Sequence, residues 1–307
     1  MSISIKYYLI ILILLNLSCT SPDDKIFEQS GEIILFTEIS RDGKKLKVFN
    51  VMDNKEYYIN DVEHRYDNDY KLFGDELKLI VFPNYGFDGD YFIYDFKTRK
   101  RLDYKIKKNQ YVVELFLGYD VYNDSLLIFA GNNNLYTIPI GVSQAPDTIP
   151  FEYMNFANLS VSSKGIIAIN YNADVNNSPT LIQIPDGYKE LVLIDLNTRE
   201  KLGQKNNVLE IGNWSNDGKF LIYTDSTKIR LLEYPSLEIT ELIGLDENFM
   251  IYHGFNFLND SLITFSGIKN DDDDQANTQL FLYDFRQKKI IDKLTISKSE
   301  KSVLDVN

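Results

Sequence analysis

The chain has 307 residues, of which 44% are hydrophobic and 13% aromatic, and its formal net charge at pH 7 is −13. This hydrophobic content is ample for a globular core. The negative charge repels phosphate backbones and no basic cluster interrupts it, so we expect no nucleic acid among the partners. With a single cysteine, no internal disulfide can form, and the fold must be held by its core alone.

The first element in chain order is an apolar segment close to the start. Lys6 precedes an apolar run over residues 7–15, and Asn16-Leu17-Ser18-Cys19 follows that run. This succession is typical of an export signal, and the run is shorter than the roughly 20 residues that span a bilayer. We therefore predict an exported protein whose first segment is either cleaved or kept as an anchor.

Cys19 lies directly behind the apolar run. The segment resembles the lipobox of bacterial lipoproteins, although Asn16 stands where that family prefers a branched aliphatic residue. The resemblance implies a signal peptide over residues 1–18, an acylated Cys19 with its tether over residues 19–31, and a folded domain over residues 32–307. The alternative is an ordinary signal with an incidental cysteine.

The residues behind Cys19 bear on the destination of the protein. Thr20 follows it, as in lipoproteins that are sent on to the outer membrane of Gram-negative bacteria, which this segment resembles. The next stretch, Ser21-Pro22-Asp23-Asp24, resembles a short acidic signal for the cell surface but also has the composition of a solvated linker. We expect a protein held to the outer membrane only by its lipid, on the periplasmic face or at the cell surface.

Six related segments of about 45 residues follow the tether, and each contains two short apolar runs. The second run ends in an aspartate between apolar residues and is followed by a polar pair and a basic residue, most clearly in Tyr91–Lys100, Leu191–Glu200 and Leu280–Lys289. The runs are rich in Ile, Val, Phe and Tyr and bounded by Asn, Asp and Gly, which is typical of strands. Repeats of this length predict propeller blades of four strands.

The entry to the fifth repeat, Asn213–Phe220, resembles the strand–turn–strand signature of TolB-like and WD-like propellers. The resemblance implies an all-β fold, a six-bladed β-propeller of four-stranded antiparallel blades. The first repeat lacks an innermost strand, so we expect the C-terminal run Ser302–Val306 to complete blade one. Five or seven blades stay open, because the third repeat is the most divergent and the fourth is the longest.

The loops between the second and third strands are long in repeats two, four and six, over Pro83–Asp90, Asn170–Glu190 and Gly267–Gln279. They are expected on one face of the propeller, where loops on a rigid scaffold often bind. The candidate binding residues are Tyr85, Phe87, Asp88, Asp90, Tyr171, Asp174, Asn176, Tyr188, Asp271, Asp272, Asp273 and Asp274. The alternative is that surface hairpins simply tolerate insertions. The acidic run offers oxygen ligands but matches no calcium loop, so no metal or cofactor is predicted.

Catalytic patterns are missing from the sequence. It contains no Gly-x-Ser-x-Gly elbow, no metal-spaced His or Cys cluster and no phosphate-binding glycine loop, and its two histidines, His64 and His253, lie in unrelated positions. No catalytic residue is therefore predicted. The function expected is a non-catalytic module that binds an envelope protein or a glycan, or a scaffold that stacks against neighbouring proteins through an apolar patch. The alternative is a glycosidase or lyase with carboxylates in the central funnel.

Three short triplets bear on modification: Asp124-Ser125-Leu126, Asp147-Thr148-Ile149 and Asp260-Ser261-Leu262. They resemble the O-glycosylation acceptors of some outer-membrane bacteria. Two of them coincide with expected turns between strands, and turn chemistry alone also accounts for those.

Overall fold

The computed structural model describes residues 33–40, 43–50, 55–59, 62, 69–74, 78–82, 90–107, 118–131, 134–151, 156–172, 189–225, 228–244, 249–269, 278–294 and 301–306. Every regular element in these ranges is a β-strand. Within the same ranges no helix has the length and apolar character needed to cross a membrane. The signal segment, Cys19 and the tether lie outside the described residues.

The strands form six four-stranded sheets, and the strands of each follow in order from the centre outward. One sheet contains β24 (Lys301–Val306), β1 (Ile33–Ser40), β2 (Gly43–Asn50) and β3 (Lys55–Tyr58). The next two contain β4 (Asp69–Phe73), β5 (Lys78–Phe82), β6 (Asp90–Asp95) and β7 (Lys100–Lys105), and then β8 (Gly118–Tyr122), β9 (Leu126–Gly131), β10 (Asn134–Pro139) and β11 (Asp147–Pro150). The following two contain β12 (Phe156–Val161), β13 (Ile166–Asn172), β14 (Lys189–Asp195) and β15 (Lys201–Asn206), and then β16 (Glu210–Trp214), β17 (Phe220–Thr224), β18 (Lys228–Glu233) and β19 (Ile239–Gly244). The last contains β20 (Phe249–Phe257), β21 (Leu262–Lys269), β22 (Thr278–Asp284) and β23 (Lys289–Leu294).

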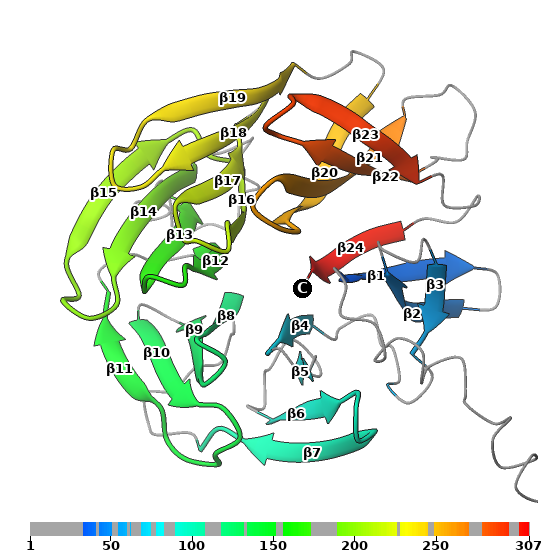
Figure 1. Cartoon of the computed structure of the whole chain (residues 1–307). Helices are drawn as coiled ribbons and strands as arrows, with labels where there is room; N and C mark the ends of the chain where they lie inside the picture. The colour runs from blue at the N-terminus through cyan, green and yellow to red at the C-terminus, as the bar shows by residue number, and fades with distance from the viewer. Residues whose placement is uncertain are drawn as a thin grey trace, which may run out of the picture.

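The sheets are arranged around a common axis, with the first strand of each sheet nearest the centre (Figure 1). The innermost strands contact one another in the order β24, β4, β8, β12, β16 and β20, and β20 also contacts β24. Neighbouring strands within each sheet are antiparallel, as the β4–β5, β5–β6 and β6–β7 pairs illustrate. The predicted all-β propeller of four-stranded antiparallel blades is therefore confirmed.

The number of blades needs a correction. Five of the six sheets consist of four strands that are consecutive in the chain. The structure therefore shows five blades of this kind, where the sequence predicts six. The remaining sheet combines β1, β2 and β3 with β24 from the far end of the chain. In it, Ile34 lies opposite Val306 and Glu38 opposite Lys301, with an irregularity after Leu35.

The recurrent aspartate at the end of the third strand has a local role in the hairpin to the fourth strand. The Asp95 carboxylate accepts a hydrogen bond from the Thr98 N–H at 2.8 Å, and Asp195 accepts from the N–H groups of Asn197 and Thr198 at 2.7 and 2.9 Å. The next residue in each case, Arg99 or Arg199, has positive φ and completes the reversal. The motif that carries the repeat pattern is therefore a turn motif, in which a short acceptor side chain ties down backbone donors.

The turn between the first and second strands of the fifth repeat follows the same logic with a serine. The Ser215 Oγ accepts from the N–H groups of Lys219 and Phe220 at 3.2 and 2.9 Å, and it donates to the Asp217 carboxylate at 2.6 Å. Gly218 has a φ of 62°, which costs a glycine little. The Asp-Gly turn expected from the propeller resemblance is therefore present.

The core consists of hydrophobic layers between neighbouring sheets. In β5, Leu79 and Val81 pack toward β1, β2 and β3, while Ile80 and Phe82 pack toward the next sheet along the chain. These four side chains are at most 1% exposed. Because successive side chains of a strand point to opposite faces, a sheet buried on both faces requires an unbroken apolar run. Full burial of one such side chain contributes about 1.5–3 kcal/mol.

Candidate functional site

The connections between second and third strands differ in length as the sequence predicts. They cover residues 83–89, 173–188 and 270–277 in the sheets of β5, β13 and β21, whereas the connections that follow β1 and β9 cover only residues 41–42 and 132–133. Every sheet runs through its strands in the same up-and-down order, so these connections all leave the same face of the ring. Three long connections therefore alternate with short ones around one face.

Two of the candidate binding residues lie within the described part of the chain. Asp90 is the first residue of β6, is exposed, and pairs with Lys105 at 2.9 Å between carboxylate oxygen and Nζ. Tyr171 lies in β13, where the sequence places it in a loop, and it is 4% exposed. The other ten candidates, Tyr85, Phe87, Asp88, Asp174, Asn176, Tyr188, Asp271, Asp272, Asp273 and Asp274, lie outside the described residues.

The position of Tyr171 corrects the expected loop boundary. Its ring belongs to the core layer between the third and fourth sheets of the chain, together with Ile167 and Ile169 of the same strand. Its hydroxyl donates to the Glu190 carboxylate at 2.5 Å, and Glu190 also accepts from the Gln204 amide. Tyr171 therefore anchors the base of the connection over residues 173–188, with its ring directed into the core.

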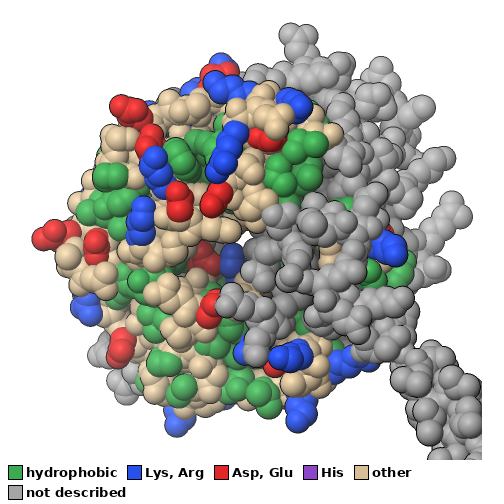
Figure 2. Space-filling view, in the orientation of Figure 1, with side chains coloured by type: hydrophobic (Ala, Val, Ile, Leu, Met, Phe, Trp, Pro, Cys, Tyr) green, Lys and Arg blue, Asp and Glu red, His purple; other side chains and the backbone are tan. Residues whose placement is uncertain are grey.

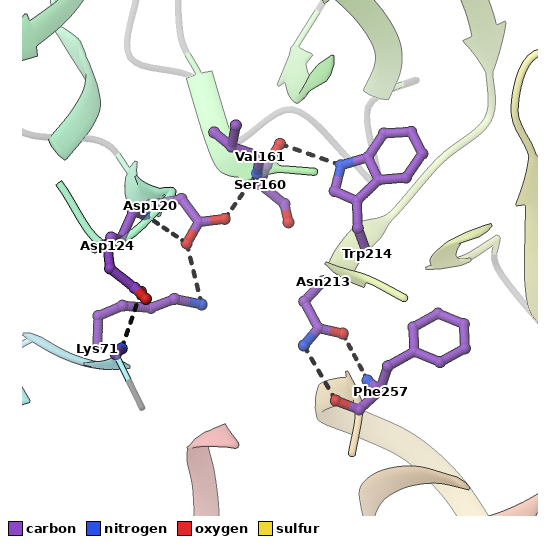
Figure 3. A network of polar contacts seen from close by, with 10 residues as sticks. Lys71, Asp120, Asp124, Ser160, Val161, Asn213, Trp214 and Phe257 are labelled. Carbon is purple, nitrogen blue, oxygen red and sulfur yellow. Dashed lines mark hydrogen bonds and ion pairs between the residues drawn. The ribbon is translucent and has the colours of Figure 1, made fainter. Parts of the chain in front are cut away.

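A second polar cluster, which the sequence did not reveal, lies on the axis (Figure 3). Asp120 of β8 is 5% exposed. Its carboxylate accepts a hydrogen bond from the Val161 N–H of β12 at 2.7 Å and another from the N–H of the next residue, Val121, at 2.8 Å. The Nζ of Lys71 in β4 lies 3.1 Å from the same carboxylate. One acidic side chain thus connects three consecutive innermost strands.

Two further side chains extend these connections around the ring. The side-chain amide of Asn213 in β16 forms two hydrogen bonds with the backbone of Phe257 in β20. It accepts from the Phe257 N–H at 2.6 Å and donates to the Phe257 carbonyl at 3.4 Å. The Trp214 indole N–H donates to the Ser160 carbonyl of β12 at 3.4 Å. The aromatic residue that carries the propeller resemblance therefore packs between blades, as that resemblance implies.

The centre of the ring is hollowed on the face that Figure 2 presents, and acidic and basic side-chain atoms are visible in the hollow. In the axial cluster the negative charge of Asp120 is balanced by Lys71 and its oxygens are occupied by backbone donors. The Asp120 carboxylate is therefore engaged by charge-assisted hydrogen bonds within the protein. Among the described residues, no group of three or more His, Cys, Asp or Glu side chains is placed to hold a metal ion.

The three glycosylation-like triplets occupy different environments. Ser125 and Thr148 are exposed, in the β8–β9 turn and in the outermost strand β11. The Ser261 hydroxyl is only partly exposed and donates to the Asn259 side chain at 3.0 Å. Two of the three hydroxyls are therefore exposed, and turn chemistry accounts for the two serines.

Comparison with known proteins supports the fold alone. No family model matches the chain, and no curated protein matches it. A chain in the crystal structure of a nidogen–laminin complex is similar over 90% of this chain and 97% of its own length, with a TM-score of 0.58 and 10% identity. A chain of the Kuenenia stuttgartiensis hydrazine synthase is similar over 82% of this chain and 90% of its own, with a TM-score of 0.52 and 8% identity.

The tricorn protease is also similar over 85% of this chain, with a TM-score of 0.40 and 13% identity, and this chain spans only 25% of its length. At that TM-score, the tricorn protease supports no conclusion about this chain. The likeness to the nidogen–laminin and hydrazine synthase chains, at 10% and 8% identity, supports the fold alone and carries no activity with it.

Proposed function

We propose that this chain is a non-catalytic binding propeller of the bacterial envelope, anchored by lipid on Cys19, which recognises an envelope protein or a glycan through one face. The observation that carries the proposal is the alternation of long and short connections, with 83–89, 173–188 and 270–277 all leaving one face of a rigid ring. Binding residues concentrate on loops that a rigid scaffold positions.

The strands at the base of the connection over residues 173–188 are held by specific polar contacts. The base of residues 173–188 is held by the Tyr171–Glu190 hydrogen bond, and Lys189 donates from its Nζ to the Leu209 carbonyl at 3.0 Å. The connection over residues 83–89 ends at Asp90, whose ion pair with Lys105 is exposed. Rigid loop bases lower the entropy that a binding loop loses on contact with its partner, which favours recognition.

The test is recovery of a partner from intact envelopes by cross-linking. The full chain is compared with a variant in which residues 173–188 are replaced by Asn-Gly, the two-residue turn that suits antiparallel strands. The control is Asn133→Gly, which gives the same Asn-Gly turn in the sheet of β9, where the connection over residues 132–133 is already Asn-Asn. We expect the partner to be lost with the first replacement and kept with the control. Equal recovery in both would contradict the proposal.

A glycosidase or lyase is the competing function. A glycosidase requires two carboxylates on either side of the scissile bond, and Asp120 is engaged with Lys71 and with backbone donors. Release of reducing ends from purified envelope polysaccharide, abolished by Asp120→Asn in a folded protein, would establish the enzyme and overturn the binding module.

The proposed anchor and export rest on the resemblance at Cys19. We expect radiolabelled palmitate to be incorporated into the wild-type chain and not into Cys19→Ser, and we expect the mature chain to fractionate with the outer membrane. Labelling of the serine variant, or retention of residues 1–18 in the mature protein, would contradict the lipoprotein interpretation.

We further propose that the sheet β24-β1-β2-β3 serves as the sixth blade and that β24 holds the ring closed. Contacts of β24 with β20 on one side and β4 on the other support this role. Removing residues 301–307 would leave β1 as an open edge. We expect a large loss of cooperative stability on urea unfolding, and an unchanged midpoint would refute the closure.

A further inference from the structure

Five of the innermost strands carry a polar residue at one common level of the axis. Each lies opposite or beside the third residue of the second strand in its sheet. Four of the pairs are Lys71 with Ile80, Asp120 with Ile128, Ser160 with Ala168 and Asn256 with Thr264. Asn213 belongs to the same level, because it sits in the irregular stretch between the Ile211–Tyr223 and Trp214–Leu221 pairs.

This common level forms a polar ring around the hollow, and the hollow is open on the face in Figure 2. In this ring the side chain of Lys71 is 22% exposed and that of Asp120 is 7% exposed. They form an ion pair, so the two charges cancel locally. A ligand that meets this pair finds a donor and an acceptor side by side.

Ser160 is the member of the ring that the fold does not explain. It is 4% exposed, and its Oγ has no hydrogen-bond partner in the described part of the chain, whereas its carbonyl accepts from Trp214 and the N–H of the next residue, Val161, donates to Asp120. Figure 3 shows the hydroxyl directed to the space between Lys71 and Asn213. A buried hydroxyl without a partner destabilises the fold, because its desolvation is not compensated by a hydrogen bond.

We propose that the axial hollow binds one small uncharged molecule rich in hydroxyl groups, no larger than a monosaccharide. A ligand hydroxyl accepts from Lys71 while donating to Asp120, and a neighbouring hydroxyl completes the bonding of Ser160. The site is apart from the long connections, so it goes beyond the binding function proposed for them.

The chemistry of the ring selects this ligand class. An anion is disfavoured, because Lys71 is already neutralised and the protein carries a net charge of −13. A cation would displace Lys71 from a carboxylate that two backbone N–H groups also occupy. An apolar molecule would leave the ion pair and the Ser160 hydroxyl unsatisfied. A hydroxyl both donates and accepts, so it suits all three groups.

The test uses the full chain with glucose, N-acetylglucosamine, myo-inositol and erythritol as probes, followed by saturation-transfer NMR and calorimetric titration. Binding of at least one probe is expected, and Ser160→Ala should weaken it about 3- to 10-fold through loss of one hydrogen bond. The matched control is Thr264→Val in β21, one strand farther from the axis, which removes another buried hydroxyl that has no partner among the described residues. It should leave the affinity unchanged.

The outcomes separate this site from the binding face. No binding of any probe, or a crystal structure with an ordered water alone on Ser160, overturns the proposal, as does equal weakening by Thr264→Val. The variant with residues 173–188 shortened should lose its envelope partner and keep its axial ligand. Far-ultraviolet circular dichroism of Ser160→Ala checks that the fold is intact.

Discussion

Removal of the Asp120 carboxylate should destabilise the protein more than removal of any exposed acidic side chain. Asp120→Ala leaves the Val161 N–H without its acceptor, which costs about 1–3 kcal/mol. It also leaves Lys71 without this counter-charge. Breaking a buried ion pair costs about 3–5 kcal/mol, and the 22% exposure of Lys71 places this pair at the lower end. Since the two costs overlap, we expect a total of about 3–4 kcal/mol.

The assay is urea unfolding followed by tryptophan fluorescence, since Trp214 is the only tryptophan and is 4% exposed. The matched control is Asp103→Ala, because Asp103 also pairs with a basic residue, Arg101, but its side chain is 68% exposed. An exposed pair contributes about 0–1 kcal/mol, so the control should stay near wild type.

Asp120→Asn separates charge from shape. It keeps the volume and one acceptor oxygen but removes the charge that faces Lys71, so its loss should lie between those of Asp120→Ala and Asp103→Ala. A double-mutant cycle with Lys71→Met should give a coupling free energy of about 1 kcal/mol or more. A loss below about 1 kcal/mol for Asp120→Ala, within the range of an exposed pair, would refute the view that this residue ties the innermost strands together.

Two further predictions concern close packing and pH. A Cβ on Gly212 would lie 2.0 Å from the Phe255 carbonyl oxygen, so Gly212→Ala should lower the free energy of unfolding by about 3 kcal/mol or more. At Gly203 the nearest atom to an added Cβ is a flexible leucine methyl, so Gly203→Ala should lower it by only about 1 kcal/mol. Similar losses for the two variants in urea unfolding would contradict the geometry. Burial acts to raise the pKa of Asp217, but hydrogen bonds from Ser215 and a backbone N–H, with nearby lysines, outweigh it and lower that pKa. The folded state gains stability from this group above the unfolded value of about 4 and loses it as the pH falls. The deficit of Asp217→Asn in urea unfolding should therefore shrink from neutral to acidic pH, and a constant deficit would count against this assignment.

The hairpin chemistry of the repeats could be read from sequence because it is local. The aspartate at 95, 195 or 284 and the basic residue four positions later belong to one turn, and the turn requires that spacing whatever surrounds it. The second and third strands of each repeat could also be predicted, because a strand that is buried on both faces needs an unbroken apolar run, and such a run is visible in the sequence. The relative lengths of the connections followed directly.

The sequence prediction placed Tyr171 in a loop that begins at Asn170, whereas β13 continues to Asn172. The apolar ring of Tyr171 continues the run Ile166–Ile169, but the intervening Asn170 looked like a loop residue. In the structure Asn170 is fully buried, and its amide donates to the Leu209 carbonyl at 3.0 Å. A buried asparagine that donates to a backbone carbonyl between two other strands, here β15 and β16, cannot be recognised from its neighbours in sequence, because its partner is distant in the chain.

By itself, the sequence determined the all-β class, the four-stranded repeat, the hairpin motifs and the unequal connections, because each depends on residues within one repeat. Only the tertiary structure decided that Lys71, Asp120, Ser160 and Asn213 share one level of the axis, because their alignment depends on the register of separate sheets. It also decided that β24 pairs with β1 and that Asp120 faces a lysine. Interactions between blades join residues some 40 or more positions apart, and no pattern within a single repeat encodes them.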